Sequence, residues 1–319
     1  MSRALSPRVA LVSCSNLPDW EVDDRSLITA LEKLNIECFR PAWDDEDFDW
    51  SSCDLILPRT TWDYQERIAD FLPWLERVAG ESRLLNPLPL IRWNLDKRYL
   101  RDIERSGLIS LPESIWLDMQ PGDAPLPPLR SLCAERGWRR AFLKPVIGAT
   151  AWGTLPFDAL SEDGLSAAEE HLREWLPRRG MILQRYHEQV EAEGEFSLIF
   201  FEGRFSHGVQ KIPRPGDYRV QDDHGATDHP WEPPGDWVTR CAELLEHLTP
   251  QPLYARCDFL RGTSGEPLLI ELELIEPSLF FRHDSAAAGR FAASILQRLG
   301  APPREDESIM GSVRLQALQ

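Results

Sequence analysis

The segments Tyr254-Ala-Arg-Cys-Asp-Phe-Leu260 and Leu268-Leu-Ile-Glu-Leu-Glu-Leu274 decide the fold, because together they predict a β-hairpin. The residues between them are rich in turn formers. Side chains alternate across a strand, so Arg256 and Asp258 share one face of the first segment, and Glu271 and Glu273 share one face of the second. A hairpin centred near Ser264 brings these four groups together and leaves four others for the core: Ala255, Cys257, Ile270 and Leu272.

The polar face of this hairpin carries three carboxylates, those of Asp258, Glu271 and Glu273. Carboxylates that converge are costly unless a cation joins them, and Mg²⁺ prefers oxygen ligands together with substrate phosphates. The alternative is a solvent-exposed sheet face on which Arg256 pairs with a glutamate. The hairpin therefore predicts either a magnesium site or an ordinary salt-bridged surface.

Length and composition exclude several classes of protein. The chain has 319 residues and suggests two or three domains. A net charge of -17 disfavours a nucleic-acid-binding surface, and no apolar run reaches the ~20 residues of a membrane span. The first residues lack the apolar core of a signal peptide, so we expect a cytoplasmic protein without a membrane partner. Its six scattered cysteines predict neither a disulfide framework nor a zinc site.

Lysine is rare in this chain, with four residues at Lys33, Lys97, Lys144 and Lys211. Lysine offers a compact point charge that suits a phosphate oxygen, whereas arginine offers a planar fork for carboxylates. Codon bias alone could explain the scarcity. Three of the four lysines nevertheless lie beside loops or strands able to hold a nucleotide.

The N-terminal part alternates between strand and helix patterns, which predicts a small parallel sheet with helices on its faces. Apolar strands are expected at Arg8–Ser13 and Cys53–Leu57, and Asp23 is placed to cap a helix between them. Loops at the carboxyl ends of such strands commonly form a ligand crevice, which draws attention to Arg59-Thr-Thr-Trp-Asp-Tyr64. Trp62 and Tyr64 could instead pack against the helix that follows.

The middle of the chain predicts further elements in a fixed order. Asn94 should cap a helix that ends at Gly107, and the proline-rich stretch from Pro121 to Pro128 indicates a surface connection. The remaining expected elements are strands at Ala141–Pro145, Met181–Tyr186, Glu195–Phe201 and Arg204–Ile212, a flexible loop at Gly148–Gly153, and helices at Asp236–His247 and Asp284–Leu299.

The order of these features resembles the ATP-grasp superfamily between Asn94 and Pro277. A second set of sequence motifs shows a closer resemblance, to the group of ATP-grasp ligases that includes the O-ureido-D-serine cyclo-ligase of D-cycloserine biosynthesis. More distant resemblances are to glutathione synthetases and D-alanine:D-alanine ligases. The motifs that carry the closer resemblance are Arg59-Thr-Thr-Trp-Asp-Tyr64, Leu84-Leu-Asn-Pro87, Arg92-Trp-Asn-Leu-Asp-Lys-Arg-Tyr-Leu100, Lys144-Pro-Val-Ile-Gly-Ala149 and Glu271-Leu-Glu-Leu-Ile-Glu-Pro-Ser-Leu279.

The resemblance implies an α/β (α+β) ATP-grasp fold with a Rossmann-like N-terminal domain. It implies a substrate domain at residues 1–93, a small lid subdomain at 94–183 and a C-terminal subdomain with the magnesium site at 184–319. It also implies binding of ATP and Mg²⁺ and a small, amino-acid-like substrate, and homodimers are common in the superfamily.

Specific roles follow from the resemblance at matching positions. Residues expected to contact ATP are Lys97, Lys144, the loop residues Gly148, Ala149 and Thr150, the segment Gln184, Arg185, Tyr186 and His187, and Glu195. Asp258, Glu271 and Glu273 would hold Mg²⁺, and Arg219, Arg256 and Lys211 would neutralise the transferring phosphoryl group. The substrate is expected against Arg59, Thr60, Trp62, Asp63 and Tyr64.

Two positions depart from the relatives. Glu273 stands where glutathione synthetases and D-alanine:D-alanine ligases carry asparagine, which adds a negative charge. The phosphate loop contains Ala149-Thr-Ala-Trp152 where several relatives are richer in glycine, which predicts a stiffer lid.

The sequence therefore predicts an Mg²⁺- and ATP-dependent carboxylate–amine ligase that acts through an acyl-phosphate, either within one substrate or between two. Two alternatives share the fold. One is a non-catalytic ATP-binding regulator, and the other is an ATP-dependent phosphotransferase.

Overall fold

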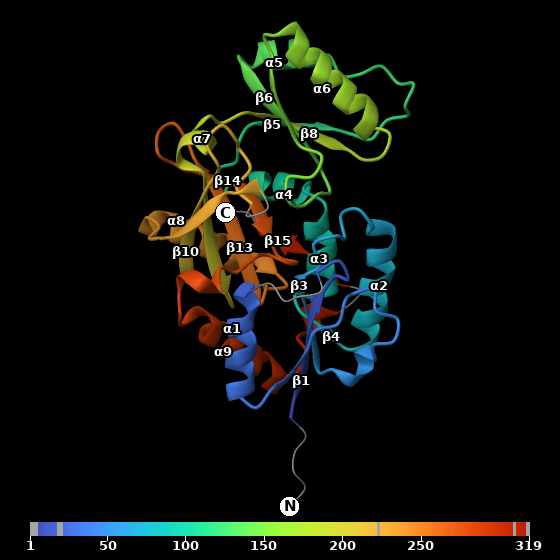
Figure 1. The fold of residues 1–319 in the computed structure, drawn as a ribbon, viewed down its shortest axis with the longest axis vertical. Coiled ribbons are helices and arrows are strands. Elements are labelled where there is room, and N and C mark those ends of the chain that lie inside the picture. The colour runs from blue at the N-terminus through green and yellow to red at the C-terminus, as the bar shows by residue number, and fades with distance from the viewer. Residues whose placement is uncertain (1–5, 18–21, 222–223, 309–310, 317–319) are drawn as a thin grey trace, which may run out of the picture.

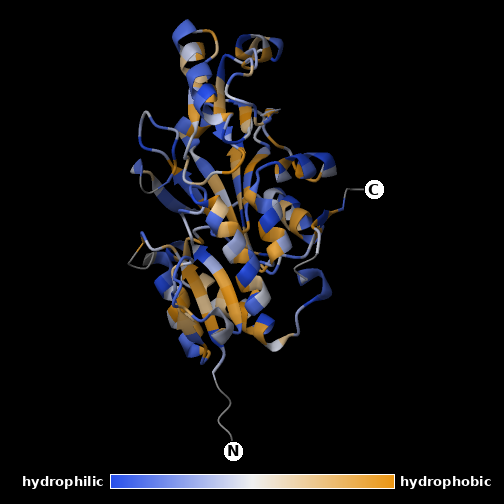
Figure 2. Cartoon of the chain, turned by 90° about the vertical axis from the view of Figure 1, so that its right-hand side faces the viewer, coloured by the Kyte–Doolittle hydropathy of each residue, from blue (hydrophilic) through white to orange (hydrophobic). Residues whose placement is uncertain are grey.

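The structure is a computed structural model that describes residues 6–17, 22–221, 224–308 and 311–316. The molecule is elongated and contains three larger sheets (Figure 1). The N-terminal sheet lies at one end of the long axis, a sheet from the middle of the chain lies at the other end, and the largest sheet lies between them. Hydrophobic residues concentrate on the strands, and hydrophilic residues mark the outer faces of the helices (Figure 2).

The N-terminal sheet is parallel, as predicted, with the strand order β2-β1-β3-β4. Val9 and Leu11 enter one core and Ala10 and Val12 another, so both faces of the sheet are covered. One face packs on α1 and α9, and the other on α2 and α3. The bounds are β1 (Arg8–Ser13), β2 (Glu37–Phe39), β3 (Leu55–Thr60), β4 (Arg83–Leu84), α1 (Arg25–Lys33), α2 (Ile68–Glu81), α3 (Leu88–Leu95) and α9 (Ala287–Gly300).

The prediction that Asp23 caps the first helix is wrong. Asp23 lies in a 3-10 turn before α1, and its carboxylate accepts a hydrogen bond from the backbone N–H of Arg282. Asp24 directly precedes the helix without capping it, because its carboxylate is engaged by Arg59.

The central sheet is antiparallel, with the order β5-β8-β6-β7, and packs against α5 and α6 in a core of its own. The Pro121 to Pro128 stretch is a surface connection without regular structure, as predicted. The bounds are β5 (Ser114–Leu117), β6 (Arg140–Pro145), β7 (Leu155–Asp158), β8 (Met181–Arg185), α5 (Leu129–Glu135) and α6 (Glu162–Trp175).

The largest sheet is antiparallel, with the order β11-β10-β9-β13-β14, and contains the predicted hairpin. The pairing Arg256↔Glu273 and Asp258↔Glu271 confirms the predicted register. The bounds are β9 (Glu195–Phe201), β10 (Arg204–Ile212), β11 (Thr227–Trp231), β13 (Tyr254–Arg261), β14 (Pro267–Glu273), α7 (Gln189–Glu193) and α8 (Gly235–Glu246), with β12 (Leu248–Thr249) and β15 (Arg314–Leu315) forming a separate pair.

The core assignment of Ile270 is wrong. The register shifts beside Phe259, which pairs with Leu269, so Ile270 is an extra residue in β14. Its side chain therefore joins a small cluster with Tyr186 and Leu260, while Leu272 stays in the main core.

Asn94 is also placed differently from the prediction. The expected helix consists of two, α3 and α4 (Tyr99–Ser106), although Gly107 ends the second with a φ of 69° as predicted. Asn94 lies inside α3, where its side chain donates to the Leu272 carbonyl (2.7 Å) and accepts from the Leu274 N–H (2.9 Å). These bonds attach α3 to β14, which explains why the asparagine is not at a helix cap.

The hydrophobic cores only partly follow the expected division at residues 93 and 183. Tyr99, Leu100 and Ile103 of α4 pack against the largest sheet and not against the central one. The division into three domains remains a prediction. All six cysteines are free thiols, five of them buried, and no helix in the described part of the chain could cross a membrane.

Candidate active site

A cleft opens where the three sheets approach one another, and side chains from all three units line it. Lys97, Lys144 and Lys211 all line this cleft, whereas Lys33 is exposed on α1. One cleft therefore contains the three lysines that the sequence places beside loops or strands able to hold a nucleotide.

One end of the cleft is apolar. Tyr186, Val190, Val220 and Leu260 form a buried cluster there, against which Phe142, Tyr218 and Ile270 pack. The rings of Phe142 and Tyr218 meet edge to face, with centroids 5.4 Å apart. A slot walled by aromatic and aliphatic side chains suits a flat heteroaromatic ring.

The segment from Gln184 to His187 runs along this slot and lines the cleft. The Gln184 amide donates to the Ser114 hydroxyl (2.8 Å), and the Tyr186 hydroxyl donates to Glu191 (2.6 Å). Burial lowers the pKa of His187, and its buried Nε2 has no hydrogen-bond partner among the described residues. The segment thus offers polar groups at the edge of an apolar slot.

The loop Gly148–Gly153 contributes its first five residues to the lining of the cleft. Lys97 Nζ donates to the Gly148 carbonyl (2.5 Å) and lies 2.8 Å from a Glu271 carboxylate oxygen, so one lysine joins the loop to the hairpin. Lys144 also lines the cleft. Its burial, together with the positive charge of Lys97, lowers the pKa of its ammonium group to about 8. Thr150 and Ala151 both have positive φ values, 51° and 58°.

The loop is anchored to the central unit by its tryptophan. The Trp152 ring meets Trp175 of α6 edge to face, with centroids 4.5 Å apart, and the Arg179 guanidinium covers its face. Gly153 has a φ of 70°, and a Cβ there would lie 2.5 Å from the Trp175 ring. Only glycine fits this position without a shift of its neighbours.

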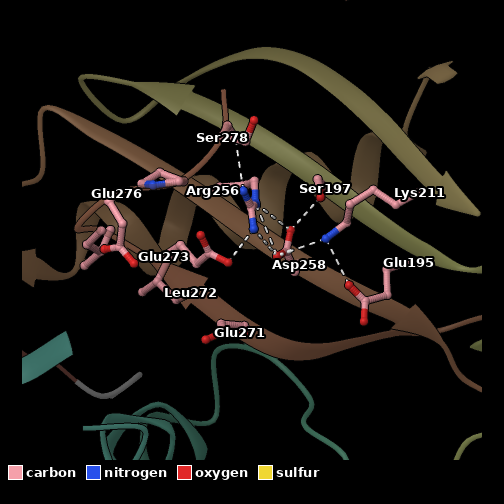
Figure 3. Close-up of polar contacts among 12 residues, drawn as sticks. Glu195, Ser197, Lys211, Arg256, Asp258, Glu271, Leu272, Glu273, Glu276 and Ser278 are labelled. Carbon is pink, nitrogen blue, oxygen red and sulfur yellow. Dashed lines mark hydrogen bonds and ion pairs between the residues drawn. The ribbon is translucent and has the colours of Figure 1, made fainter. Parts of the chain in front are cut away.

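The centre of the cleft is a network of opposite charges, which Figure 3 shows around Asp258. Arg256 donates to both oxygens of Asp258, Lys211 Nζ lies 3.3 Å from one of them, and the Ser197 hydroxyl bonds the other. Lys211 also pairs with Glu195 at 2.9 Å, and Arg256 pairs with Glu273. Both cations are thus held in place by the buried Asp258 carboxylate and by one partly exposed glutamate each.

Electrostatics in this network follow from burial and from the pairing. Burial would raise the pKa of Asp258, but Arg256 and Lys211 outweigh it, and the net pKa is lowered. Burial would lower the pKa of Lys211, but Asp258 and Glu195 raise it. Asp258, Lys211 and Arg256 therefore remain charged at neutral pH.

The three predicted metal ligands are not gathered into a ready-made site, since no group of three His, Cys, Asp or Glu within the described ranges could hold a metal ion. Asp258 is saturated by Arg256, Lys211 and Ser197. The side chains of Glu271 and Glu273 are 31% and 26% exposed, so their oxygens remain open to the cleft. These hard oxygen donors suit Mg²⁺, provided that Lys97 and Arg256 release them.

Arg219 also lines the cleft, at its open side. Its guanidinium forms a forked pair with Asp217, with a shortest distance of 2.7 Å, and its side chain is 38% exposed. The structure therefore brings Arg219 to the cleft but not to Asp258.

Two of the five residues expected to contact substrate line the cleft. Trp62 Nε1 donates to the Glu276 carbonyl (3.0 Å), and the hydroxyl of the buried Tyr64 forms a hydrogen bond with the Glu276 carboxylate. Burial, and to a smaller extent the negative charge of Glu273, raise the pKa of Glu276 to about 8.

The other three residues expected to contact substrate, Arg59, Thr60 and Asp63, do not line the cleft. β3 extends to Thr60 and is buried throughout, so Arg59 and Thr60 lie in the sheet and not in a loop. Arg59 pairs with Asp24 (2.8 Å) and donates to the Pro277 carbonyl (3.0 Å). Asp63 accepts from Trp43 Nε1 (2.8 Å). These residues hold the neighbouring segments together.

The sequence interpretation missed several residues of the cleft. Glu276 lies within the quoted stretch from Glu271 to Leu279, and an acidic residue directly before a proline, just past a strand, was the available signal. The apolar wall carried no such signal, because its members come from separate segments: Phe142, Val190, Tyr218, Val220, Leu260 and Ile270.

Comparison with known proteins agrees with this geometry. Residues 9–86 match the family model for the N-terminal domain of the D-cycloserine synthetase DcsG. Over 301 residues the chain is 33% identical to the cycloserine biosynthesis protein DcsG of Streptomyces lavendulae, which covers 91% of this chain and 98% of that protein.

Solved structures show the same relationship. The crystal structure of the D-cycloserine synthetase DcsG matches with a TM-score of 0.81 and 30% identity, over 92% of this chain and 99% of that one. The ATP-grasp ligase PsnB, solved with a phosphomimetic variant of its minimal precursor, Mg and ADP, shares the fold with a TM-score of 0.60 at 14% identity, over 92% and 99% of the two chains.

These matches confirm the resemblance and the ATP-grasp fold that the sequence predicted, and they favour an enzyme over an ATP-binding regulator. The chain belongs to the DcsG family of ATP-grasp ligases, ATP-dependent enzymes that form C–N bonds.

Proposed function

We propose that this protein activates the carboxylate of an amino acid or small peptide-like substrate as an acyl-phosphate, which a nitrogen nucleophile then attacks. The observation that carries the proposal is the convergence of Lys97, Lys144, Lys211 and Arg256 with four paired carboxylates in one cleft. Phosphoryl transfer depends mainly on positioning and on cations around the transferred group, which this cleft supplies.

The nucleotide would occupy the apolar slot and the adjoining loop. The adenine ring would lie against Phe142 and Ile270, with its polar edge toward the backbone from Gln184 to His187. Lys97, Lys144 and the loop at Gly148, Ala149 and Thr150 would bind the phosphates, and Glu195 the ribose hydroxyls.

Mg²⁺ would be held by Glu271 and Glu273, with Asp258 as a third ligand once Lys211 and Arg256 turn toward phosphate oxygens. When bound, the ion would supply positive charge to the γ-phosphoryl group. The positive charges of Lys211 and Arg256 stay neutralised in this exchange, because each side chain gains a phosphate oxygen as it leaves the Asp258 carboxylate. The relative PsnB was solved with Mg and ADP, which supports the same cofactors here.

The proposed reaction has two steps, phosphorylation of the carboxylate and attack by the nitrogen. A substrate carboxylate oxygen attacks the γ-phosphorus, an O–P bond forms and ADP leaves. The nitrogen nucleophile then attacks the carbonyl carbon, the C–N bond forms, and phosphate leaves as the nitrogen loses a proton. Arg256, Lys211 and Arg219 would neutralise the transferring oxygens, and Arg219 must leave Asp217 to do so.

The relatives favour cyclisation within one amino-acid derivative, because they are named as D-cycloserine synthetases or cycloserine biosynthesis proteins. An intermolecular ligation uses the same two steps. Both require a closed cleft, because water would hydrolyse the acyl-phosphate.

A screen of amino acids, including O-ureido-D-serine, for Mg²⁺-dependent ADP release tests the proposal. Active substrates should give a product of the mass expected for a new amide, and a hydroxamate when hydroxylamine is added. A stable phosphorylated product without an amide would instead identify a phosphotransferase. ADP release without either product would contradict the ligase assignment.

A further inference from the structure

One carboxylate of the cleft, that of Glu276, differs from the others because it forms no ion pair among the described residues. Among the described lining residues, Glu195, Asp258, Glu271 and Glu273 each pair with a lysine or arginine. Glu276 forms no ion pair within the part of the chain that the structure describes, although it is only 8% exposed. A buried carboxylate is costly unless a positive group or a proton neutralises it. The Glu276 carboxylate interacts with the Tyr64 hydroxyl and, at longer range, with Lys97, but Lys97 is paired with Glu271. Glu276 therefore has no ion-pair partner of its own among the described residues and can accept a cation from a ligand.

The position of Glu276 is fixed by its backbone. Trp62 Nε1 donates to its carbonyl (3.0 Å), and Arg59 Nη1 donates to the carbonyl of the next residue, Pro277 (3.0 Å). Figure 3 shows the Glu276 side chain on one side of Arg256, with Lys211 on the other. Both Trp62 and Tyr64 line the cleft, and aromatic faces attract organic cations.

We infer that Glu276, with Trp62 and Tyr64 beside it, binds the ammonium group of the substrate and selects compounds with a free amine near the activated carboxylate. The inference rests on the proposed function, in which Arg256 neutralises the oxygens that are transferred at that carboxylate. An α-amino acid carries both charges one carbon apart, and Arg256 and Glu276 offer the complementary pair.

This arrangement has a chemical consequence for the second step. A nitrogen held as an ammonium group has no free electron pair, so the α-nitrogen cannot attack the acyl-phosphate. The new C–N bond must therefore form with another nitrogen, either elsewhere in the same substrate or in a second one. Glu276 would thus protect the activated amino acid from reacting with further copies of itself through its α-amine.

The variants Glu276→Gln and Glu276→Asp test this role, with Glu66→Gln as a control. Glu66 is exposed close to the Trp62 and Tyr64 segment and does not line the cleft, so its replacement removes the same charge from a site in solvent. The probes are the amino acid that stimulates ADP release most strongly in the screen and the same acid without its amino group. Circular dichroism and the KM for ATP report whether each variant is folded.

Glu276→Gln should raise the KM for the amino acid about 10- to 100-fold, as expected for the loss of a charged hydrogen bond. It should leave the KM for the deaminated acid and for ATP within about 3-fold, so the preference for the amino acid collapses. Glu276→Asp should recover part of that preference, and Glu66→Gln should match the wild type.

Three outcomes would overturn the inference. The first is a Glu276→Gln variant that still prefers the amino acid over its deaminated analogue. The second is an unchanged KM for the amino acid with a raised requirement for Mg²⁺, which would place Glu276 among the metal ligands. The third is a variant whose KM values for both acids rise equally. If the wild type releases no ADP with any amino acid, the proposed function fails instead, so the two failures are distinguishable.

Discussion

Replacement of Arg59 separates a positioning role from substrate binding. The Arg59 and Asp24 side chains are each 1% exposed and lie 2.8 Å apart, and Arg59 also donates to the Pro277 carbonyl beside Glu276. Arg59→Met removes the cation and leaves the Asp24 carboxylate buried. The double variant Asp24→Asn, Arg59→Met removes both charges.

The magnitude follows from this geometry. At 2.8 Å the attraction between two unit charges is about 6 kcal/mol at an effective dielectric constant of ~20, before desolvation is subtracted. Breaking a buried pair by removing one partner typically costs about 3–5 kcal/mol. For a chain of this size, Arg59→Met should therefore lower Tm by about 6–20 °C. The double variant should recover most of that loss, because no unpaired charge remains.

Thermal melting followed by circular dichroism measures the stability, and ADP release with the best amino acid measures turnover. Arg77→Met is the matched control, because Arg77 pairs with Glu81 at an exposed site and its loss should cost less than about 1 kcal/mol. The double variant should regain both Tm and turnover. A double variant that melts near the wild type yet stays as inactive as Arg59→Met would show that Arg59 contacts the substrate.

Three further perturbations test other parts of the cleft. Glu271→Gln should lose Mg²⁺-dependent turnover by at least about 100-fold while the Tm stays within a few degrees; near-normal activity would refute its assignment as a metal ligand. Lys144, whose pKa burial lowers to about 8, is charged below that pH, so the KM for ATP should rise above pH 8 by at most about tenfold per pH unit. A flat profile up to pH 9.5 would remove Lys144 from the phosphate site. Gly153→Ala places a Cβ 2.5 Å from the Trp175 ring and should raise the KM for ATP. The control Gly137→Ala has a similar φ of 66° and open space around it, so it should leave that KM unchanged. Equal effects of the two variants would mean that the Trp175 contact is unimportant.

The hairpin was the most predictable part of the fold, because strand alternation alone places Arg256, Asp258, Glu271 and Glu273 on one face. The structure confirms that register. Alternation could not reveal the extra residue in β14, which turns Ile270 from the main core into the apolar slot of the cleft. A bulge depends on pairing with the neighbouring strand and has no marker in a sequence of apolar residues.

The errors at Asn94 and Arg59 have a common origin. Both are polar residues whose partners lie far along the chain, namely the backbone of β14 for Asn94 and Asp24 and Pro277 for Arg59. Local patterns assign such residues to helix caps or binding loops, because those are the usual places for exposed polar groups. Glu276 was overlooked although it directly precedes a proline just past a strand, because its lack of an ion pair becomes visible only when the ion pairs of the described cleft residues are known.

Oxygen transfer from the substrate to phosphate tests the acyl-phosphate mechanism most directly. The enzyme would be incubated with ATP, Mg²⁺ and an active amino acid whose carboxylate is labelled with ¹⁸O, and the released phosphate would be analysed by mass spectrometry. The mechanism predicts one ¹⁸O atom in each phosphate formed, together with ADP and a product that contains a new C–N bond. Unlabelled phosphate, or AMP in place of ADP, would contradict it.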